Sequence, residues 1–225
     1  MTWKSLTQKI TKCERCPRLR QYCRAIAEKK RRQYLRESYW GRPVPGFGDP
    51  RAPIWIIGLA PGAHGANRTG RMFTGDSSGD WLYGALYQFG FASQPSSTDR
   101  IDGMKLHGVY ISAATRCAPP DNKPSLVELR NCSQFLDQEF LLLDRTRIFL
   151  GLGKIGFESI LHVLKRQGIA IPTPTPKFSH GATYDVGDYT LLASYHPSRQ
   201  NTQTGRLTQP MWLEIFKNLK KLNEA

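Results

Sequence analysis

The sequence lacks the features of membrane and secreted proteins. None of its 225 residues belong to an apolar run long enough to cross a bilayer. The first ten residues, MTWKSLTQKI, have no apolar stretch like the middle of a signal peptide. The five cysteines are an odd number, which argues against a disulfide framework in a reducing compartment. These absences predict a cytoplasmic protein that is not secreted.

Two common phosphate-binding loops are also missing. The glycine-rich stretch GLAPGAHGANRTGRMFTGD, at 58–76, directly follows an apolar run. It has neither the Gly-Lys-Ser/Thr ending of one such loop nor the GxGxxG spacing of the other. A phosphate-transfer enzyme built on this stretch is therefore disfavoured.

Acidic residues are scarce. Lys plus Arg is 32 and Asp plus Glu is 18, so the formal net charge is +14. The basic residues include a KKRR run at 29–32. Such a charge is typical of a protein that meets a polyanion, and nucleic acid is the first candidate. Charge that serves solubility alone stays an alternative.

Four apolar runs predict buried strands, and helical patterns lie between them. The strand segments are PIWIIGLA (53–60), GVYISAAT (108–115), RIFLGLG (147–153) and YTLLASYH (189–196). Alternating strands and helices indicate an α/β fold, a three-layer α/β/α sandwich with a four-stranded parallel sheet. The first 50 residues show no strand pattern and predict helical segments. No repeat or long linker divides the chain, so a single domain over 1–225 is expected.

The cysteines predict a metal site. Cys13 and Cys16 form a CxxC pair, Cys117 opens a loop, and Cys132 lies in the helix after it. Four thiolates bind either zinc or a [4Fe–4S] cluster, and the spacing alone does not separate the two. Small buried hydrophobic residues are the alternative. Cys23 falls outside the pattern. A metal here would tie the N-terminal segment to the sandwich.

The loops after the predicted strands locate the chemistry, because ligands of open α/β sheets bind outside the carboxyl ends of the strands. Two of these loops, GLAPGAHGANRTGRMFTGD and HPSRQNTQTGRLT, resemble the two motifs of the uracil-DNA glycosylase superfamily. The likeness is to its B-type branch, the fifth family. This resemblance implies base excision from DNA and favours a structural [4Fe–4S] cluster over zinc.

One position carries the assignment to this branch, and a second segment departs from the related fourth family. The related fourth family has an acidic residue after the first glycine of its GEAPG motif, where this chain has Leu59. That family also reads the pyrimidine with an Asn, in a segment that here contains Ala113 and Ala114. The loss of this Asn implies relaxed base selection, so that hypoxanthine and xanthine are accepted beside uracil.

The resemblance implies three catalytic residues. Asp76 would orient water and stabilise the cationic sugar, with a helix N-cap as its alternative or additional role. His196 would donate a hydrogen bond to the departing base, and a satisfied imidazole at a strand end is its alternative. Asn122 would assist at the reacting centre, or it is only a turn residue.

Further residues would hold the flipped base and the DNA. Phe73 resembles the aromatic residue on which the base stacks. Asn201 begins a wedge that would enter the DNA double helix and fill the space left by the base. The residues expected at the base are Gly58, Ala60, Gly62, His64 and Phe73. The phosphate contacts expected are Arg68, Arg71, Lys123, Arg199 and Arg206, with the KKRR run as outer support.

The prediction is a monofunctional DNA glycosylase, since Lys123 matches no lyase pattern. It would act as a monomer on double-stranded DNA in the nucleoid, leaving an abasic site, and single-stranded DNA is a second candidate substrate. A second hypothesis is a metal-tethered nucleic-acid-binding module without catalysis.

Overall fold

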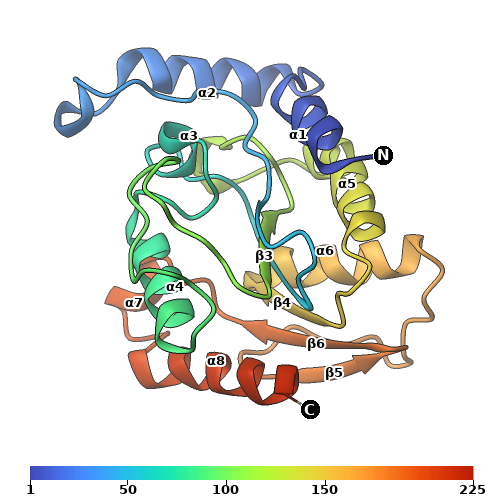
Figure 1. The fold of residues 1–225 in the computed structure, drawn as a ribbon. Helices are drawn as coiled ribbons and strands as arrows, with labels where there is room; N and C mark the ends of the chain where they lie inside the picture. Colours follow the sequence, from blue (N-terminus) through green and yellow to red (C-terminus); the bar gives the residue numbers. More distant parts are fainter. Residues whose placement is uncertain (225) are drawn as a thin grey trace.

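The computed structural model describes residues 1–224, which form a mixed sheet between two helical layers (Figure 1). The sheet has six strands in the order β1-β3-β2-β4-β6-β5. Their bounds are Phe47–Gly48 (β1), Ile54–Gly58 (β2), Val109–Ala113 (β3), Ile148–Leu152 (β4), Thr183–Val186 (β5) and Tyr189–Ser194 (β6). The four inner strands are parallel to one another, and β1 and β5 pair antiparallel at the edges.

The predicted sheet is therefore right in its centre and wrong at its edges. A purely parallel sheet of four strands was expected, and two short antiparallel strands complete it. β5 turns back onto β6 through Gly187 and Asp188, with Gly187 at a φ of 59°. Its residues are mostly accessible, so it lacks the continuous apolar run of a central strand. β1 has only two residues, too few for a period to be visible in the sequence.

The helices form the two outer layers and an N-terminal layer, which consists of residues 1–40. Their bounds are Trp3–Thr11 (α1), Pro17–Lys29 (α2), Ala66–Thr69 (α3), Ser77–Gln88 (α4), Leu126–Leu142 (α5), Gly153–Arg166 (α6), Arg199–Gln203 (α7) and Gln209–Glu224 (α8), with short 3₁₀ helices at Arg32–Tyr34 (η1) and Pro120–Asn122 (η2). Helices α4 and α8 cover one face of the sheet, and α5 and α6 cover the other. Among residues 1–224, no helix has both the length and the apolar character needed to span a membrane.

The strands alternate their side chains between the two cores. On β2, Ile54 and Ile56 pack with α4 and α8, whereas Trp55 and Ile57 pack with α5 and α6. Every residue of β2 is buried. Burial on both faces explains why the sequence shows an unbroken apolar run there.

Direct contacts attach the N-terminal layer to the sandwich. The Trp3 ring lies 4.9 Å from that of Tyr110 on β3. Arg18 pairs with Glu128 of α5 at 2.6 Å. The apolar face of α1 packs against α5 through Leu6. These contacts are among those that attach the layer in the structure, and an additional tie through a metal stays a prediction.

Candidate active site

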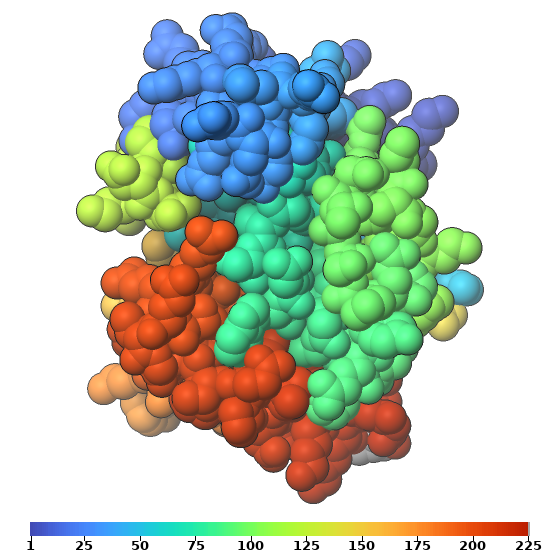
Figure 2. Space-filling model, turned by 90° about the vertical axis from the view of Figure 1, so that its left-hand side faces the viewer, coloured from blue at the N-terminus to red at the C-terminus, as the bar shows by residue number. Residues whose placement is uncertain are grey.

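One cavity of about 800 Å³ opens at the carboxyl ends of the parallel strands. Its walls come from the loop after β2, the loop after β3, the start of α6, the segment after β6, and the N-terminal layer. Figure 2 shows this face, where the blue N-terminal segment, the teal loop after β2 and the orange segment after β6 surround a hollow. Predicted residues that line it are Ala60, Gly62, His64, Phe73, Asp76, Asn122, His196 and Arg199.

Asp76 uses its two carboxylate oxygens differently. Oδ1 caps α4 and accepts the backbone N–H groups of Ser78 and Gly79, each at 3.1 Å. Oδ2 lies against the glycines of the preceding loop, since a Cβ on Gly65 would be 1.9 Å from it and one on Gly62 would be 2.7 Å away. Only glycine lets the loop approach the carboxylate so closely. The cap and a free oxygen on the cavity wall therefore coexist in one side chain.

Burial raises the pKa of Asp76 above its usual value, and the two N–H bonds from Ser78 and Gly79 act in the opposite direction. The carboxylate is thus poorly hydrated. A poorly hydrated negative charge interacts strongly with a positive charge that develops beside it.

Phe73 and His196 form a stacked pair in the cavity. Their ring centroids lie 5.6 Å apart with an interplanar angle of 29°. Phe73 has a left-handed backbone, with a φ of 53°, and its ring covers the end of β2 at Gly58, where a Cβ would lie 2.7 Å from the ring. Asn201 donates its side-chain N–H to the His196 carbonyl at 2.8 Å. Gly58 and Asn201 thus support this pair from outside the cavity lining.

His196 is a neutral imidazole at physiological pH. Burial lowers its pKa to about 4, because an apolar setting disfavours the charged form. Its side chain offers a hydrogen bond without carrying a charge of its own.

Asn122 lies in a tightly turned loop. It and Asp121 both have left-handed backbones, with φ values of 56° and 53°. Such conformations cost about 1–3 kcal/mol each for most residues, although Asn and Asp tolerate them best. Both residues line the cavity. The turn therefore directs two polar residues toward one space.

The sequence did not predict some of the residues that line the cavity. The N-terminal layer contributes a whole wall, made of Tyr22, Arg31, Gln33 and Tyr34. Of these, only Arg31 belongs to a segment with a predicted role, the KKRR run. Helical patterns carry no signal for which distant loop they will face. Lys154 and Ile155, which follow β4, also line the cavity.

Two predicted phosphate contacts are wrong. Arg68 is 8% exposed and pairs with Glu37, and Arg71 is 5% exposed and pairs with Asp102 at 2.6 Å. Both guanidinium groups hold loops together inside the protein, because a buried cation needs a partner. They are not available to DNA. A basic residue in a polar motif does not reveal its burial from sequence alone.

The remaining basic candidates lie at the surface. Lys123, Arg199 and Arg206 are exposed. Arg199 sits on the cavity rim and donates to the Ser77 hydroxyl at 3.2 Å. The Arg206 guanidinium lies 4.7 Å from the centre of the Tyr195 ring.

The five cysteines are all free thiols that gather at the junction of the N-terminal layer and α5. Cys16, Cys23 and Cys117 share one buried apolar cluster, and Cys13 packs with Cys132 in the neighbouring one. The side chain of Asn131 donates to the Cys16 sulfur at 3.5 Å. Within residues 1–224, no three His, Cys, Asp or Glu side chains are placed to hold a single metal ion.

Arg116 provides a test of whether the thiols suit a larger cofactor. It precedes Cys117, is 1% exposed, and pairs with Glu139 through one nitrogen, while its Nε and Nη1 have no partner in the protein. Buried N–H groups normally find an acceptor. The sulfur atoms of an iron–sulfur cluster accept hydrogen bonds. The cysteines offer such a cluster four thiolates, and Arg116 is a buried donor next to Cys117 in the chain.

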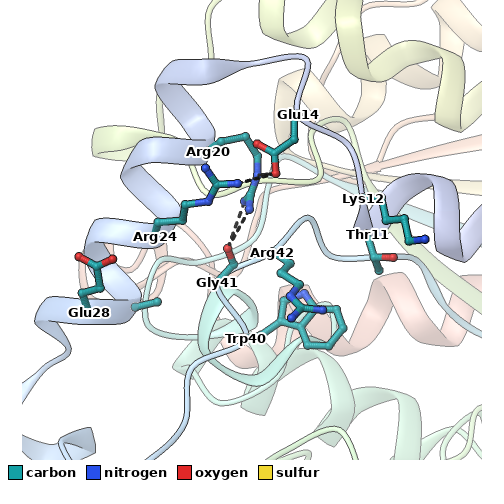
Figure 3. A pocket seen from close by; sticks show the side chains of 10 residues that line it. Thr11, Lys12, Glu14, Arg20, Arg24, Glu28, Trp40, Gly41 and Arg42 are labelled. Atoms are coloured by element: carbon teal, nitrogen blue, oxygen red, sulfur yellow. Dashed lines mark hydrogen bonds and ion pairs between the residues drawn. The ribbon is translucent and has the colours of Figure 1, made fainter.

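A second pocket, of about 530 Å³, lies on another side of α2 (Figure 3). Glu14 accepts from Arg20 and Arg24, and Arg20 also donates to the Gly41 carbonyl at 3.1 Å. Arg20 and Arg24 are four residues apart and share a helix face, whereas Tyr22 points the opposite way, to the large cavity. Glu14 pairs with Arg20 and Arg24, and Arg20 joins α2 to the backbone at Gly41.

The family model described as "Uracil DNA glycosylase superfamily" matches residues 45–220. The chain belongs to the uracil-DNA glycosylase superfamily. A "Type-5 uracil-DNA glycosylase" of Thermus thermophilus is 48% identical over 99% of each chain. Relatives of the same description include proteins of Mycobacterium bovis, 46% identical over 95% of this chain and 79% of its own length, and Pyrobaculum aerophilum, 42% identical over 93% and 88%.

The superfamily's fourth type is more distant. A "Type-4 uracil-DNA glycosylase" of Pyrobaculum aerophilum is 26% identical over 88% of this chain and 84% of its own length. The prediction that the chain resembles the fifth type is confirmed.

Proposed function

We propose that this protein is a monofunctional DNA glycosylase that flips uracil out of DNA and hydrolyses its N-glycosidic bond, leaving an abasic site in base excision repair. The observation that carries the proposal is the single cavity lined by both Asp76 and His196. The names of the type-5 relatives support uracil as a substrate. Hypoxanthine and xanthine are proposed as further substrates.

Bond breakage places opposite charges on the two products. The sugar becomes cationic as the C1′–N bond lengthens, and the base takes the electron pair. Asp76 Oδ2, the oxygen not used by the α4 cap, stabilises the sugar cation and orients a water. The water oxygen then bonds to C1′, and the proton that the water loses ends on the departed base, which is released as a neutral molecule. Oδ1 thus keeps the α4 cap throughout the reaction, while Oδ2 acts on the sugar and the water.

His196 serves the departing base. A neutral imidazole N–H donates to a base carbonyl as negative charge gathers there. The stacked ring of Phe73 restricts the imidazole, so the donor is held in place before the reaction. Asn122, on the opposite loop, supplies a further polar group at the reacting centre.

Recognition of the base rests on shape and backbone. Ala60 and Gly62 bring backbone close to the cavity, and Phe73 offers a ring face for stacking, which is indifferent to base identity. Leu59, where the fourth family has an acidic residue, also lines the space. A cavity without a dedicated pyrimidine-reading Asn suits both uracil and deaminated purines.

The DNA backbone is held by exposed cations around the cavity. Arg31, Lys154 and Arg199 line it, and Lys123 and Arg206 are exposed on neighbouring segments. Phosphate contacts of this kind give affinity without sequence preference. Asn201 and the turn after α7 form the proposed wedge, which offsets part of the unstacking cost, a few kcal/mol. One chain holds the complete cavity, so a monomer suffices, acting at the nucleoid in the cytoplasm.

A [4Fe–4S] cluster is proposed on Cys13, Cys16, Cys117 and Cys132. Bound there, it cross-links the N-terminal layer to α5 and takes no part in breaking the glycosidic bond. Cys23 lies beside Cys117, and its thiol donates a hydrogen bond to the Ala118 carbonyl at 3.6 Å. It is not part of the proposed ligand set.

The test is excision from duplex DNA containing a single uracil, followed by cleavage at abasic sites. Wild-type protein should yield strand breaks only at the uracil, and the Asp76→Asn variant should yield few. If wild-type protein binds this DNA without releasing the base, the non-catalytic binding module is the correct reading. A panel with hypoxanthine, xanthine and uracil in single strands then defines the substrate range.

A further inference from the structure

Residues 31–40 form a strap that leads from α2 across the cavity wall. Arg68, in the loop after β2, fastens this strap. Its guanidinium pairs with Glu37 and lies 3.9 Å from the centre of the Tyr34 ring. The same side chain donates through Nε to the carbonyl of His64 at 2.8 Å. Strap and His64 are thus held by one buried cation.

A direct hydrogen bond joins the strap to the imidazole. The Tyr39 hydroxyl lies 3.0 Å from His64 Nδ1, and the rings meet edge to face at 6.0 Å. The same hydroxyl oxygen accepts the backbone N–H of Arg31 at 3.4 Å. Accepting from Arg31 uses only a lone pair of this oxygen, so the hydroxyl hydrogen is available to donate to Nδ1.

Both partners are neutral. Burial, and then the charges of Arg31 and Arg68, lower the pKa of His64. Burial likewise raises the pKa of Tyr39, so the phenol keeps its proton. A neutral imidazole that accepts at Nδ1 carries its hydrogen on Nε2.

We infer that Tyr39 is a positioning residue that fixes the Nε2–H tautomer of His64, which then donates a hydrogen bond to a carbonyl of the flipped base. His64 lines the cavity, and Nδ1 is occupied by Tyr39, so Nε2 is the nitrogen left for a ligand. The inference rests on the proposed glycosylase function and adds a residue that determines specificity.

The chemistry of deamination explains why a fixed donor is useful. Cytosine and adenine carry an amino donor where uracil and hypoxanthine carry a carbonyl acceptor. A donor locked at Nε2 pairs with the carbonyl but faces the amino group donor to donor, and unpaired buried donors are costly. One imidazole can therefore separate damaged bases from their normal parents among both pyrimidines and purines.

The tautomer can be measured without activity. Imidazole ¹⁵N spectra of the full-length protein should show His64 as the Nε2–H form in wild type and as a mixture in Tyr39→Phe. Tyr22→Phe is the matched control, because Tyr22 also lines the cavity but makes no hydrogen bond to His64 among the described residues. An unchanged His64 signal in Tyr39→Phe overturns the inference.

Kinetics test the use of the donor. A Gln amide nitrogen takes nearly the place of Nε2, and an Asn amide that of Nδ1. His64→Gln should keep single-turnover uracil excision within about threefold of wild type, whereas His64→Asn and Tyr39→Phe should lose about tenfold, the worth of one hydrogen bond. The double variant Tyr39→Phe with His64→Asn should be no slower than His64→Asn alone.

The outcomes separate the two proposals. Equal losses in His64→Gln and His64→Asn, or additive losses in the double variant, overturn the role of Nε2–H. Failure of wild-type protein to release uracil overturns the glycosylase itself, while the tautomer measurement still decides what Tyr39 does to His64.

Discussion

The cavity has two kinds of wall, and they differ in how they arise. One wall consists of loops that leave the parallel strands, and it carries Asp76, Phe73 and His196. The other consists of the N-terminal layer, with Tyr22 and Arg31. The first follows from sheet topology, because the carboxyl ends of parallel strands meet at one edge. The second depends on which surface the N-terminal helices cover.

The difference suggests a division of labour. Charge-stabilising groups lie on the rigid sheet edge, where small displacements are resisted by a packed core. Groups from the N-terminal layer would bind DNA and orient a neighbour. Substitutions on the sheet-edge wall should therefore affect the bond-breaking step. Those on the N-terminal wall should affect binding, apart from Tyr39, which acts through His64.

The largest effect is expected for Asp76→Asn. An amide keeps an oxygen for the α4 cap but removes the charge that stabilises the sugar. Single-turnover excision of uracil should fall by about 10³-fold, with little change in thermal stability. Gly65→Ala offers an independent check, since its Cβ would displace Oδ2. Parent-like excision by Asp76→Asn would contradict the assignment.

His196→Ala should come next. Loss of the preorganised donor should slow the chemical step by about 10²-fold, while affinity for DNA with an uncleavable abasic analogue changes by less than about threefold. Rapid-quench kinetics and fluorescence anisotropy measure the two. His162→Ala, on the exposed side of α6, is the control and should behave as wild type. Equal losses in rate and affinity would place His196 in binding instead.

Arg116→Met should weaken the proposed cluster. Outer-sphere partners are typically worth about 10–100-fold in metal affinity, so iron, sulfide and visible colour should fall. Arg71→Met also removes a buried, paired cation but lies away from the cysteines, and it should keep its iron. The same iron loss in both variants would point to general destabilisation, which a thermal melt would reveal.

Acidification should slow excision through Asp76. Because the pKa of Asp76 is raised, its carboxylate takes up a proton at a higher pH than an ordinary aspartate does as the solution is acidified. The pKa of His196 is about 4, so His196 stays neutral down to about that pH. The rate should be flat near neutral pH and then fall by about tenfold per unit below the Asp76 pKa. A pH–rate profile of single-turnover excision measures this. The residual activity of Asp76→Asn should not show this limb.

Arg31→Ala should give the smallest effect. Affinity for DNA should fall a few-fold, and the slope of log K against log salt should decrease by about 0.9, as for one lost phosphate contact. The chemical step should stay nearly unchanged. Arg42→Ala, an exposed cation at the second pocket, should leave the slope as it is. If Arg31→Ala lowered the excision rate more than the affinity for DNA, the assignment of the N-terminal wall to binding would be contradicted.

Sequence patterns predicted the central architecture well. The apolar runs became the four parallel strands, and the helical patterns became α4, α5, α6 and α8. They missed β5 because an exposed edge strand has no continuous apolar run. They also misjudged Arg68 and Arg71, because a charged side chain looks the same in a sequence whether it meets solvent or a buried carboxylate.

The sequence by itself determined the four parallel strands and the helices between them, the basic charge and the two motif loops with Asp76 and His196, because these depend on local periodicity and residue chemistry. Only the tertiary structure decided that Asp76 divides its oxygens between a cap and the cavity, and that Tyr39 reaches His64. Such contacts join residues that are distant in the sequence, and the packing of the helices and loops determines which of them meet.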